Sequence, residues 1–228
     1  ILNCSTSLEQ LENVKKEILA LPDGSCTCCR CDVSDSSQVT AMFEEISTTC
    51  GQIDVLINNA GISHIGLFTD MTDDLWDRMI QTNLSSVFYC SRAILPSMIS
   101  RKKGKIINIS SMNAYTPLTK IPAYSGAKAA ISNFTEWLAV HFSKVGIRCN
   151  AIAPGFFSTQ QNAKLLFNED GTPTARTGKI LNNTPMDRFG EVEELIGSVL
   201  FLACEEASGF VNGACIPIDG AFAAYSGV

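Results

Sequence analysis

The sequence predicts an α/β fold in which a doubly wound parallel sheet lies between two layers of helices. Helical and strand-like hydrophobic patterns alternate along the 228 residues, as is typical of a parallel sheet with crossover helices. Polar and glycine-rich residues follow the predicted strands, which is where parallel sheets bind ligands. The length suits one domain, residues 1–228, with a sizeable core.

The individual elements follow from hydrophobic spacing and from turn residues. Predicted helices repeat apolar residues every three or four positions, and predicted strands are short apolar runs that end at a polar or glycine-rich residue. In order, the elements are a helix over 8–19, a strand over 26–33, a helix that starts at Asp35 or Ser36, a strand over 53–57, a helix over 73–100, a strand over 105–109, a helix over 124–143, a strand over 147–153, a helix over 191–204 and a strand over 214–218.

Residues 156–190 interrupt this alternation. The segment is more polar than its surroundings and contains Gly171, Pro173, Gly178 and Pro185. Long irregular excursions in compact domains are often mobile covers over a site. We therefore expect 156–190 to be a substrate lid.

Composition and cysteine usage exclude several classes of partner. The net charge of −6 and the lack of a basic stripe argue against nucleic acid, and no apolar run approaches the ~20 residues of a membrane helix. Four of the ten cysteines fall within 26–33, where neighbouring side chains of a strand point to opposite faces and cannot easily share a metal ion. We expect structural thiols, no metal site and a reducing, cytoplasmic compartment.

The pair Tyr124 and Lys128 carries the first chemical prediction. Four residues apart on a predicted helix, the two side chains share a face. A nearby ammonium lowers the pKa of a phenol from about 10 and prepares it for proton transfer. Ser111 follows a predicted strand, and its hydroxyl could bind the same substrate oxygen. Alternatively, Ser110 and Ser111 only cap backbone groups of the loop.

Five short motifs follow one another along the chain. They are Asn58-Asn59-Ala60-Gly61, Gln81-Thr82-Asn83-Leu84, Ile109-Ser110-Ser111, Tyr124-x-x-x-Lys128 and Pro154-Gly155-x-x-x-Thr159. Tyr115, the rival tyrosine, lacks a lysine four residues on. In this order the motifs resemble the short-chain dehydrogenase/reductase family over the whole chain. The resemblance implies a Rossmann-like dinucleotide-binding domain that interconverts a ketone and a secondary alcohol with NAD or NADP.

The same resemblance implies a role for each motif. Tyr124 is the general acid/base, Lys128 lowers its pKa and binds the nicotinamide ribose, and Ser111 orients the substrate carbonyl. Asn83 supports a water-linked proton relay to Lys128, or only distorts its helix. The cofactor would contact Asp32, Val33, Asn59, Ala60, Gly61, Tyr124, Lys128, Pro154, Gly155, Phe157 and Thr159, and the substrate would contact Ser111, Tyr124, Gln161 and Asn162.

The chain departs from the family pattern at its beginning. A first strand, a T-G-x-x-x-G-x-G turn that cradles the pyrophosphate, a first helix and most of strand two have no counterpart before Ile1. We expect an N-terminally incomplete domain with an apolar slot in its sheet and weak dinucleotide binding by this chain alone. Asn3 stands where an acidic residue would favour NAD, so the sequence leans slightly toward NADP.

Substrate class and assembly are also implied by resemblance. Residues 153–162, 166–174 and 222–228 resemble the D-mannonate oxidoreductase (fructuronate reductase) branch, with Lys164 or Arg176 as a carboxylate partner or as a solvated surface charge. Ketogluconate, sugar-alcohol or 3-oxoacyl reduction are alternatives within the family. A non-catalytic binding or assembly module is the alternative outside the enzyme class. Family members commonly form tetramers through two long helices and the last strand, so we expect a homotetramer.

Overall fold

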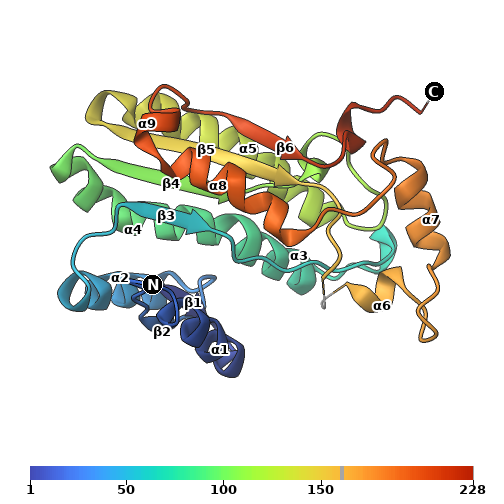
Figure 1. Cartoon of the computed structure of the whole chain (residues 1–228), viewed down its shortest axis with the longest axis horizontal. Coiled ribbons are helices and arrows are strands. Elements are labelled where there is room, and N and C mark those ends of the chain that lie inside the picture. The colour runs from blue at the N-terminus through green and yellow to red at the C-terminus, as the bar shows by residue number, and fades with distance from the viewer. Residues whose placement is uncertain (160–161, 228) are drawn as a thin grey trace.

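The structure, a computed structural model, describes residues 1–159 and 162–227 and contains a four-stranded parallel sheet (Figure 1). Its strands are β3 (Val55–Asn58), β4 (Gly104–Ile109), β5 (Ile147–Pro154) and β6 (Cys215–Ile218), in that spatial order. Two shorter strands, β1 (Leu2–Cys4) and β2 (Cys28–Arg30), pair in parallel as a separate sheet. The predicted parallel α/β architecture is confirmed, although the described strands divide into two sheets.

Helices cover both faces of the larger sheet, which gives three layers (Figure 1). On one face lie α4 and α5, and on the other lies α8. The two helices α6 and α7 lie beyond the carboxyl ends of the strands. The helices are α1 (Leu8–Leu19), α2 (Ser36–Thr49), α3 (Asp73–Ile80), α4 (Ser86–Arg101), α5 (Pro122–Phe142), α6 (Ala163–Leu166), α7 (Ala175–Asn182), α8 (Ile196–Ala203) and α9 (Glu205–Ser208).

Some predicted elements differ from the observed ones in length. The strand predicted over 26–33 is reduced to β2, and the helix predicted over 73–100 is divided by a π-helical turn at Gln81–Ser85. The helix predicted over 191–204 begins with a 3-10 turn at Val192–Leu195. The region 156–190 is less irregular than its composition suggested, because it contains α6 and α7.

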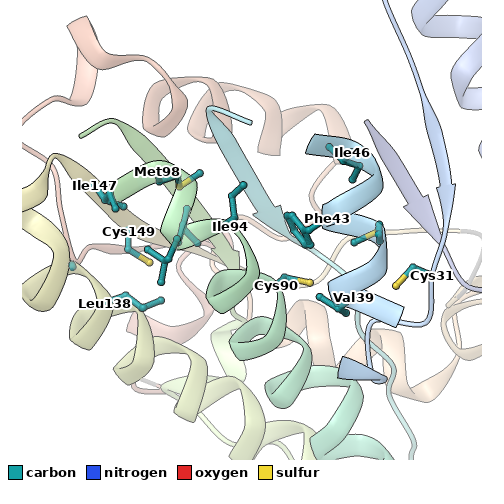
Figure 2. Close-up of a cluster of buried hydrophobic side chains, with 14 residues drawn as sticks. Cys31, Val39, Phe43, Ile46, Cys90, Ile94, Met98, Leu138, Ile147 and Cys149 are labelled. Carbon is teal, nitrogen blue, oxygen red and sulfur yellow. The ribbon is translucent and has the colours of Figure 1, made fainter. Parts of the chain in front are cut away.

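The main hydrophobic core joins the two sheets. Side chains of α2, including Val39 and Phe43, pack against α4, and the cluster continues through β4 and β5 to Leu138 of α5 (Figure 2). The buried thiols Cys31, Cys90 and Cys149 belong to this core, and burial raises their pKa values to about 11, 12 and 12. Within the described residues all cysteines are free, and we find no cluster of three metal-ligating side chains.

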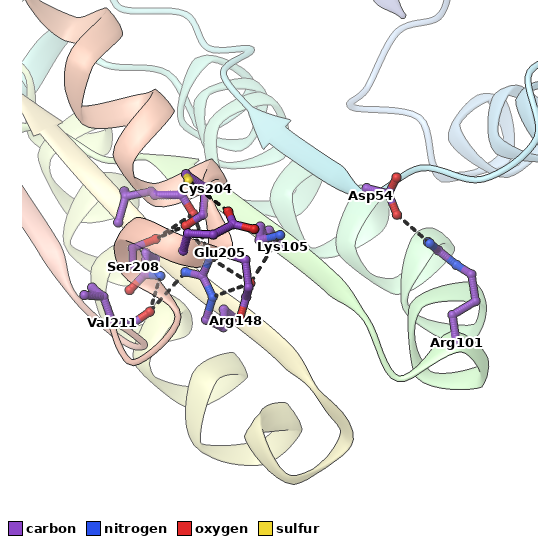
Figure 3. Close-up of polar contacts among 11 residues, drawn as sticks. Asp54, Arg101, Lys105, Arg148, Cys204, Glu205, Ser208 and Val211 are labelled. Carbon is purple, nitrogen blue, oxygen red and sulfur yellow. Dashed lines mark hydrogen bonds and ion pairs between the residues drawn. The ribbon is translucent and has the colours of Figure 1, made fainter.

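Ion pairs anchor the sheet at the edge opposite the candidate site (Figure 3). Lys105 and Arg148, near the amino ends of β4 and β5, are both buried and both lie 3.3 Å from Glu205 of α9. Arg148 also donates to the carbonyl oxygens of Leu202 and Val211. Because the buried guanidinium has several acceptors, this contact holds the α8–α9 segment on the sheet.

A groove of about 490 Å³, lined by both apolar and polar side chains, lies between the two sheets. Leu2 and Asn3 of β1 line one side, and Val55 and Ile57 of β3 line the other. No pairing joins β1 to β3 in the part of the chain that the structure describes. No helix within the described ranges combines the length and the apolar character that a membrane span requires.

Candidate active site

Three of the predicted catalytic side chains meet at the carboxyl end of β4. Ser111 follows β4 directly and begins a 3-10 turn, while Tyr124 and Lys128 lie on the first turns of α5. The Lys128 ammonium donates to the carbonyl oxygen of Ile109 at 2.6 Å and lies 5.5 Å from the centre of the Tyr124 ring. The Ser111 hydroxyl lies near enough to Tyr124 to lower the pKa of the phenol. The fold thus brings the serine, tyrosine and lysine to one place.

Ser110 and Ser132 hold α5 in register with β4. The Ser110 hydroxyl donates to the main-chain oxygen of Lys128 at 3.1 Å and lies 2.8 Å from the Ser132 hydroxyl. This contact ties the strand end to the helical turn that carries Lys128, so it fixes where the ammonium sits. Sequence reasoning assigned Ser110 only to loop capping and did not identify Ser132. Ser132 lies four residues after Lys128 on the same helix, and this spacing could have indicated that the two residues share a helix face.

A polar chain below the site joins β3, β4 and α5. Asn58, the first residue of the Asn58–Gly61 motif, donates to Asn108 at 2.8 Å, and Asn108 donates to Thr135 at 2.9 Å. Asn108 and Thr135 are fully buried. A buried amide without a hydrogen-bond partner destabilises the fold. This series of hydrogen bonds therefore specifies how the three elements align under the site.

Burial dominates the electrostatics of the tyrosine and the lysine. It raises the pKa of Tyr124 above its usual range, and the nearby Ser111 hydroxyl opposes that rise. Burial also lowers the pKa of Lys128 to about 8, because a desolvated ammonium is costly. The lowering of the Tyr124 pKa by Lys128 stays a prediction. In this geometry the ammonium donates to Ile109, and the Ser111 hydroxyl acts to lower the pKa of the phenol.

Asn83 is fully buried within the π-helical turn. Its amide nitrogen donates to the carbonyl oxygens of Ile62 and Met79, both at 2.9 Å, and its amide oxygen accepts from the Ile62 main chain at 3.2 Å. The side chain therefore connects the turn to the loop that follows Asn58–Gly61. A Cβ on Gly61 would lie 2.7 Å from the Asn83 amide oxygen, so this approach needs a glycine. The relay role of Asn83 stays a prediction.

Three of the residues predicted to contact the cofactor lie along the groove between β1 and β3. Val33, Asn59 and Ala60 line it. Asp32 follows β2, where its carboxylate accepts from the main chain and the hydroxyl of Ser34 at 3.0 and 2.7 Å. The Asp32 carboxylate thus stabilises the turn that follows β2. Asn3 of β1 donates to the main-chain oxygen of Cys31.

The segment after β5 is held against the end of β6. Gly155 passes so close to Asp219 that a Cβ would lie 2.6 Å from it, and Phe157 forms a bridge with Gly190. Asn162 donates to the carbonyl of Phe157 at 2.8 Å and accepts from the main chain of Thr159 at 2.9 Å. The Asn162 amide thus shapes the loop that begins at Pro154. Gln161, the other predicted substrate contact in this loop, lies outside the described residues.

The residues present fit a nicotinamide dinucleotide. The buried Lys128 ammonium has three donors, and the structure assigns one of them to Ile109. The remaining donors can bind ribose hydroxyl groups at the carboxyl edge of the sheet. Val33, Asn59 and Ala60 line a groove along the same sheet that could receive the adenosine. When bound there, the nicotinamide would supply or accept a hydride.

A parallel sheet with serine, tyrosine and lysine at its carboxyl edge defines an NAD(P)-dependent oxidoreductase. The sequence profile of the short chain dehydrogenase family matches residues 1–170, and the chain belongs to this family. A Haemophilus influenzae protein named an uncharacterized oxidoreductase is 48% identical over 239 residues, which span 97% of this chain and 84% of that protein.

Two solved structures share the fold over nearly the whole chain. A candidate D-mannonate oxidoreductase from Haemophilus influenzae, with bound NAD, is 46% identical with a TM-score of 0.89, and the match covers 96% of this chain and 84% of that one. A gluconate 5-dehydrogenase from Burkholderia cenocepacia, in complex with NADP and tartrate, is 30% identical with a TM-score of 0.89, covering 98% and 85%. The family thus includes structures with either cofactor.

Proposed function

We propose that the protein interconverts a ketone and a secondary alcohol on a sugar acid of the fructuronate/mannonate type. The observation that carries this proposal is the grouping of Ser111, Tyr124 and Lys128 at the carboxyl edge of the sheet, the edge beyond which α6 and α7 lie. In reduction, the Tyr124 phenol gives its proton to the carbonyl oxygen, and the Ser111 hydroxyl donates a hydrogen bond to the same oxygen. Oxidation runs through the same groups in reverse, with the phenolate as base.

The polar composition of residues 156–190, the expected lid, favours an acidic, polyhydroxylated substrate over an acyl chain. Lys164 of α6 is exposed, whereas Arg176 of α7 is half-buried, and neither forms an ion pair among the described residues. We propose Arg176 as the partner of the substrate carboxylate, because a half-buried guanidinium binds carboxylates more strongly than a solvated ammonium. The relatives named for mannonate and gluconate, one of them with bound tartrate, favour the same class. Ketogluconate is the second candidate.

Assays of the full-length protein with sugar acids and neutral sugar alcohols, each with NAD(H) and NADP(H), test the proposal. We expect Arg176→Gln to raise KM for the sugar acid by about 10-fold or more, the scale of one charged hydrogen bond. Turnover of a neutral sugar alcohol should stay unchanged. Lys164→Gln is the matched control and should leave both substrates unaffected. A preference for 3-oxoacyl substrates, or an equal loss with the neutral substrate, would contradict the assignment.

We also propose that the face formed by α4 and α5 packs against a second copy of the chain, as the first contact of a homotetramer. An apolar groove of about 760 Å³ runs between the two helices, lined in part by Phe88, Phe134 and Trp137. Trp137 is 51% exposed and Val140 is 80% exposed. Large exposed apolar patches are typical of interfaces, and a two-fold axis would place the same groove on both copies.

A charge in this groove should separate the copies. We expect Trp137→Glu to reduce the mass in solution, measured by light scattering after size exclusion, because a buried carboxylate without a partner destabilises an interface. Gln10→Glu, on the exposed side of α1, adds the same charge and should leave the mass unchanged. A wild-type protein that is monomeric at micromolar concentration would refute this assembly.

A further inference from the structure

Asn113, two residues after Ser111, directs both of its nitrogen donors at one oxygen atom. The residue is buried within the 3-10 turn Met112–Ala114. Its main-chain N–H donates to the Ser111 hydroxyl oxygen at 3.2 Å, and its amide Nδ2 donates to the same atom at 3.5 Å. Neither motif spacing nor the family resemblance drew attention to this residue.

The orientation of the Asn113 amide is set from the other side of the loop. Its Oδ1 accepts the main-chain N–H of Leu118 at 3.1 Å. An amide whose oxygen faces Leu118 must present its nitrogen to the opposite side, where Ser111 lies. The loop between β4 and α5 therefore determines which end of the Asn113 amide reaches the serine.

A serine hydroxyl has one proton and two acceptor lone pairs. With both lone pairs directed at Asn113, the Ser111 proton has to point away from the loop, toward the side of the site where Tyr124 lies. We propose that Asn113 is a positioning residue that holds the Ser111 hydroxyl as a donor toward Tyr124 and the substrate oxygen. This inference rests on the proposed function, since it assigns Ser111 the role of hydrogen-bond donor in the same reaction.

If this inference holds, the pKa of the Tyr124 phenol depends on an uncharged neighbour, the Ser111 hydroxyl. The charged group beside the Tyr124 ring is the Lys128 ammonium, at 5.5 Å on the same helix, and that ammonium is bound to Ile109. The Ser111 hydroxyl is the group that lowers the pKa of the phenol. A Ser111 hydroxyl that can rotate freely stabilises the phenolate less, so loss of the Asn113 donor should raise the pKa of Tyr124.

Asn113→Asp tests this directly. The variant keeps the shape and the acceptor for Leu118, but it presents a carboxylate to Ser111, which would draw the serine proton away from Tyr124. We expect the midpoint of the pH profile of kcat for alcohol oxidation to rise by about 1 unit or more. The new carboxylate repels the Tyr124 phenolate, and the amide donor to Ser111 is lost, so both changes raise the pKa of the phenol. We also expect kcat near neutral pH to fall about 10-fold with a smaller change in KM. Asn113→Ala, without the charge, should shift the midpoint in the same direction by less.

A matched control and a substrate-free readout separate this inference from the proposed function. Gln10→Glu on α1 adds an equal charge far from the site and should leave the pH profile unmoved. Tyrosinate absorbance of the protein with cofactor bound, compared with Tyr124→Phe, reports the phenol without any substrate. An unchanged Tyr124 titration in both Asn113 variants would overturn the inference even if a sugar acid is turned over. If Asn113→Asp does not fold, Asn113→Ala decides by the same two measurements.

Discussion

Tyr124→Phe should lower kcat by at least ~100-fold, the scale of lost general acid/base catalysis. The substitution removes one oxygen from a ring that lies between Ser111 and Lys128, so the site keeps its shape and loses only the group that exchanges a proton with the substrate. Because burial raises the pKa of this phenol, the wild-type enzyme should oxidise its alcohol faster as the pH rises. Steady-state kinetics in both directions measure this effect.

Tyr115→Phe is the matched control for that experiment. The Tyr115 hydroxyl donates to the main-chain oxygen of Cys215 at 3.3 Å, away from Lys128. Removing it should change kcat by less than about 3-fold, since a single neutral hydrogen bond contributes only about 1 kcal/mol to stability and this one touches no reacting atom. If the two tyrosine variants lose activity equally, or Tyr124→Phe turns over like wild type, the assignment of the acid/base is wrong.

Lys128→Met should abolish most of the activity and yet stabilise the fold near neutral pH. Burial lowers the pKa of Lys128 to about 8 from an ordinary 10.5, so below pH 8 the folded protein must keep a charge buried. Removing the ammonium relieves that cost, and the lost bond to Ile109 offsets part of the gain. We therefore expect the free energy of unfolding of Lys128→Met at pH 7 to be about 2 kcal/mol higher than that of the wild-type protein. We expect kcat to fall by at least ~100-fold in the same variant.

The pH dependence identifies the cause of that stabilisation. Between pH 8 and 10.5 the folded wild-type protein has released the Lys128 proton and the unfolded chain still holds it, so wild-type stability rises with pH through this window. The advantage of Lys128→Met should therefore shrink from pH 7 to pH 10 in urea unfolding. Lys144→Met replaces an exposed lysine and should leave no pH-dependent difference. A Lys128→Met protein that is less stable than wild type at pH 7 would contradict the argument.

Local spacing in the sequence predicted much of the fold and the centre of the site. The alternation of apolar runs identified the parallel α/β architecture, because helix and strand periods differ and depend on near neighbours. Tyr124 and Lys128 share a helix face for the same reason, and Ser111 is placed by the end of β4.

Only the tertiary structure decided how these groups are held and oriented. The sequence did not predict that Ser110 bonds the Lys128 main chain, that Asn83 bonds Ile62, or that Asn113 directs both donors at Ser111. The first two contacts join residues far apart in the chain, and the third depends on a loop whose course local propensity does not determine. The spacing of apolar residues along the sequence indicates which face of a helix or strand is buried. The hydrogen-bond partner of a buried polar atom depends instead on which elements pack together. The sequence by itself therefore determined the chemistry available to this protein, and the packing of β4 against α5 decided how that chemistry is directed.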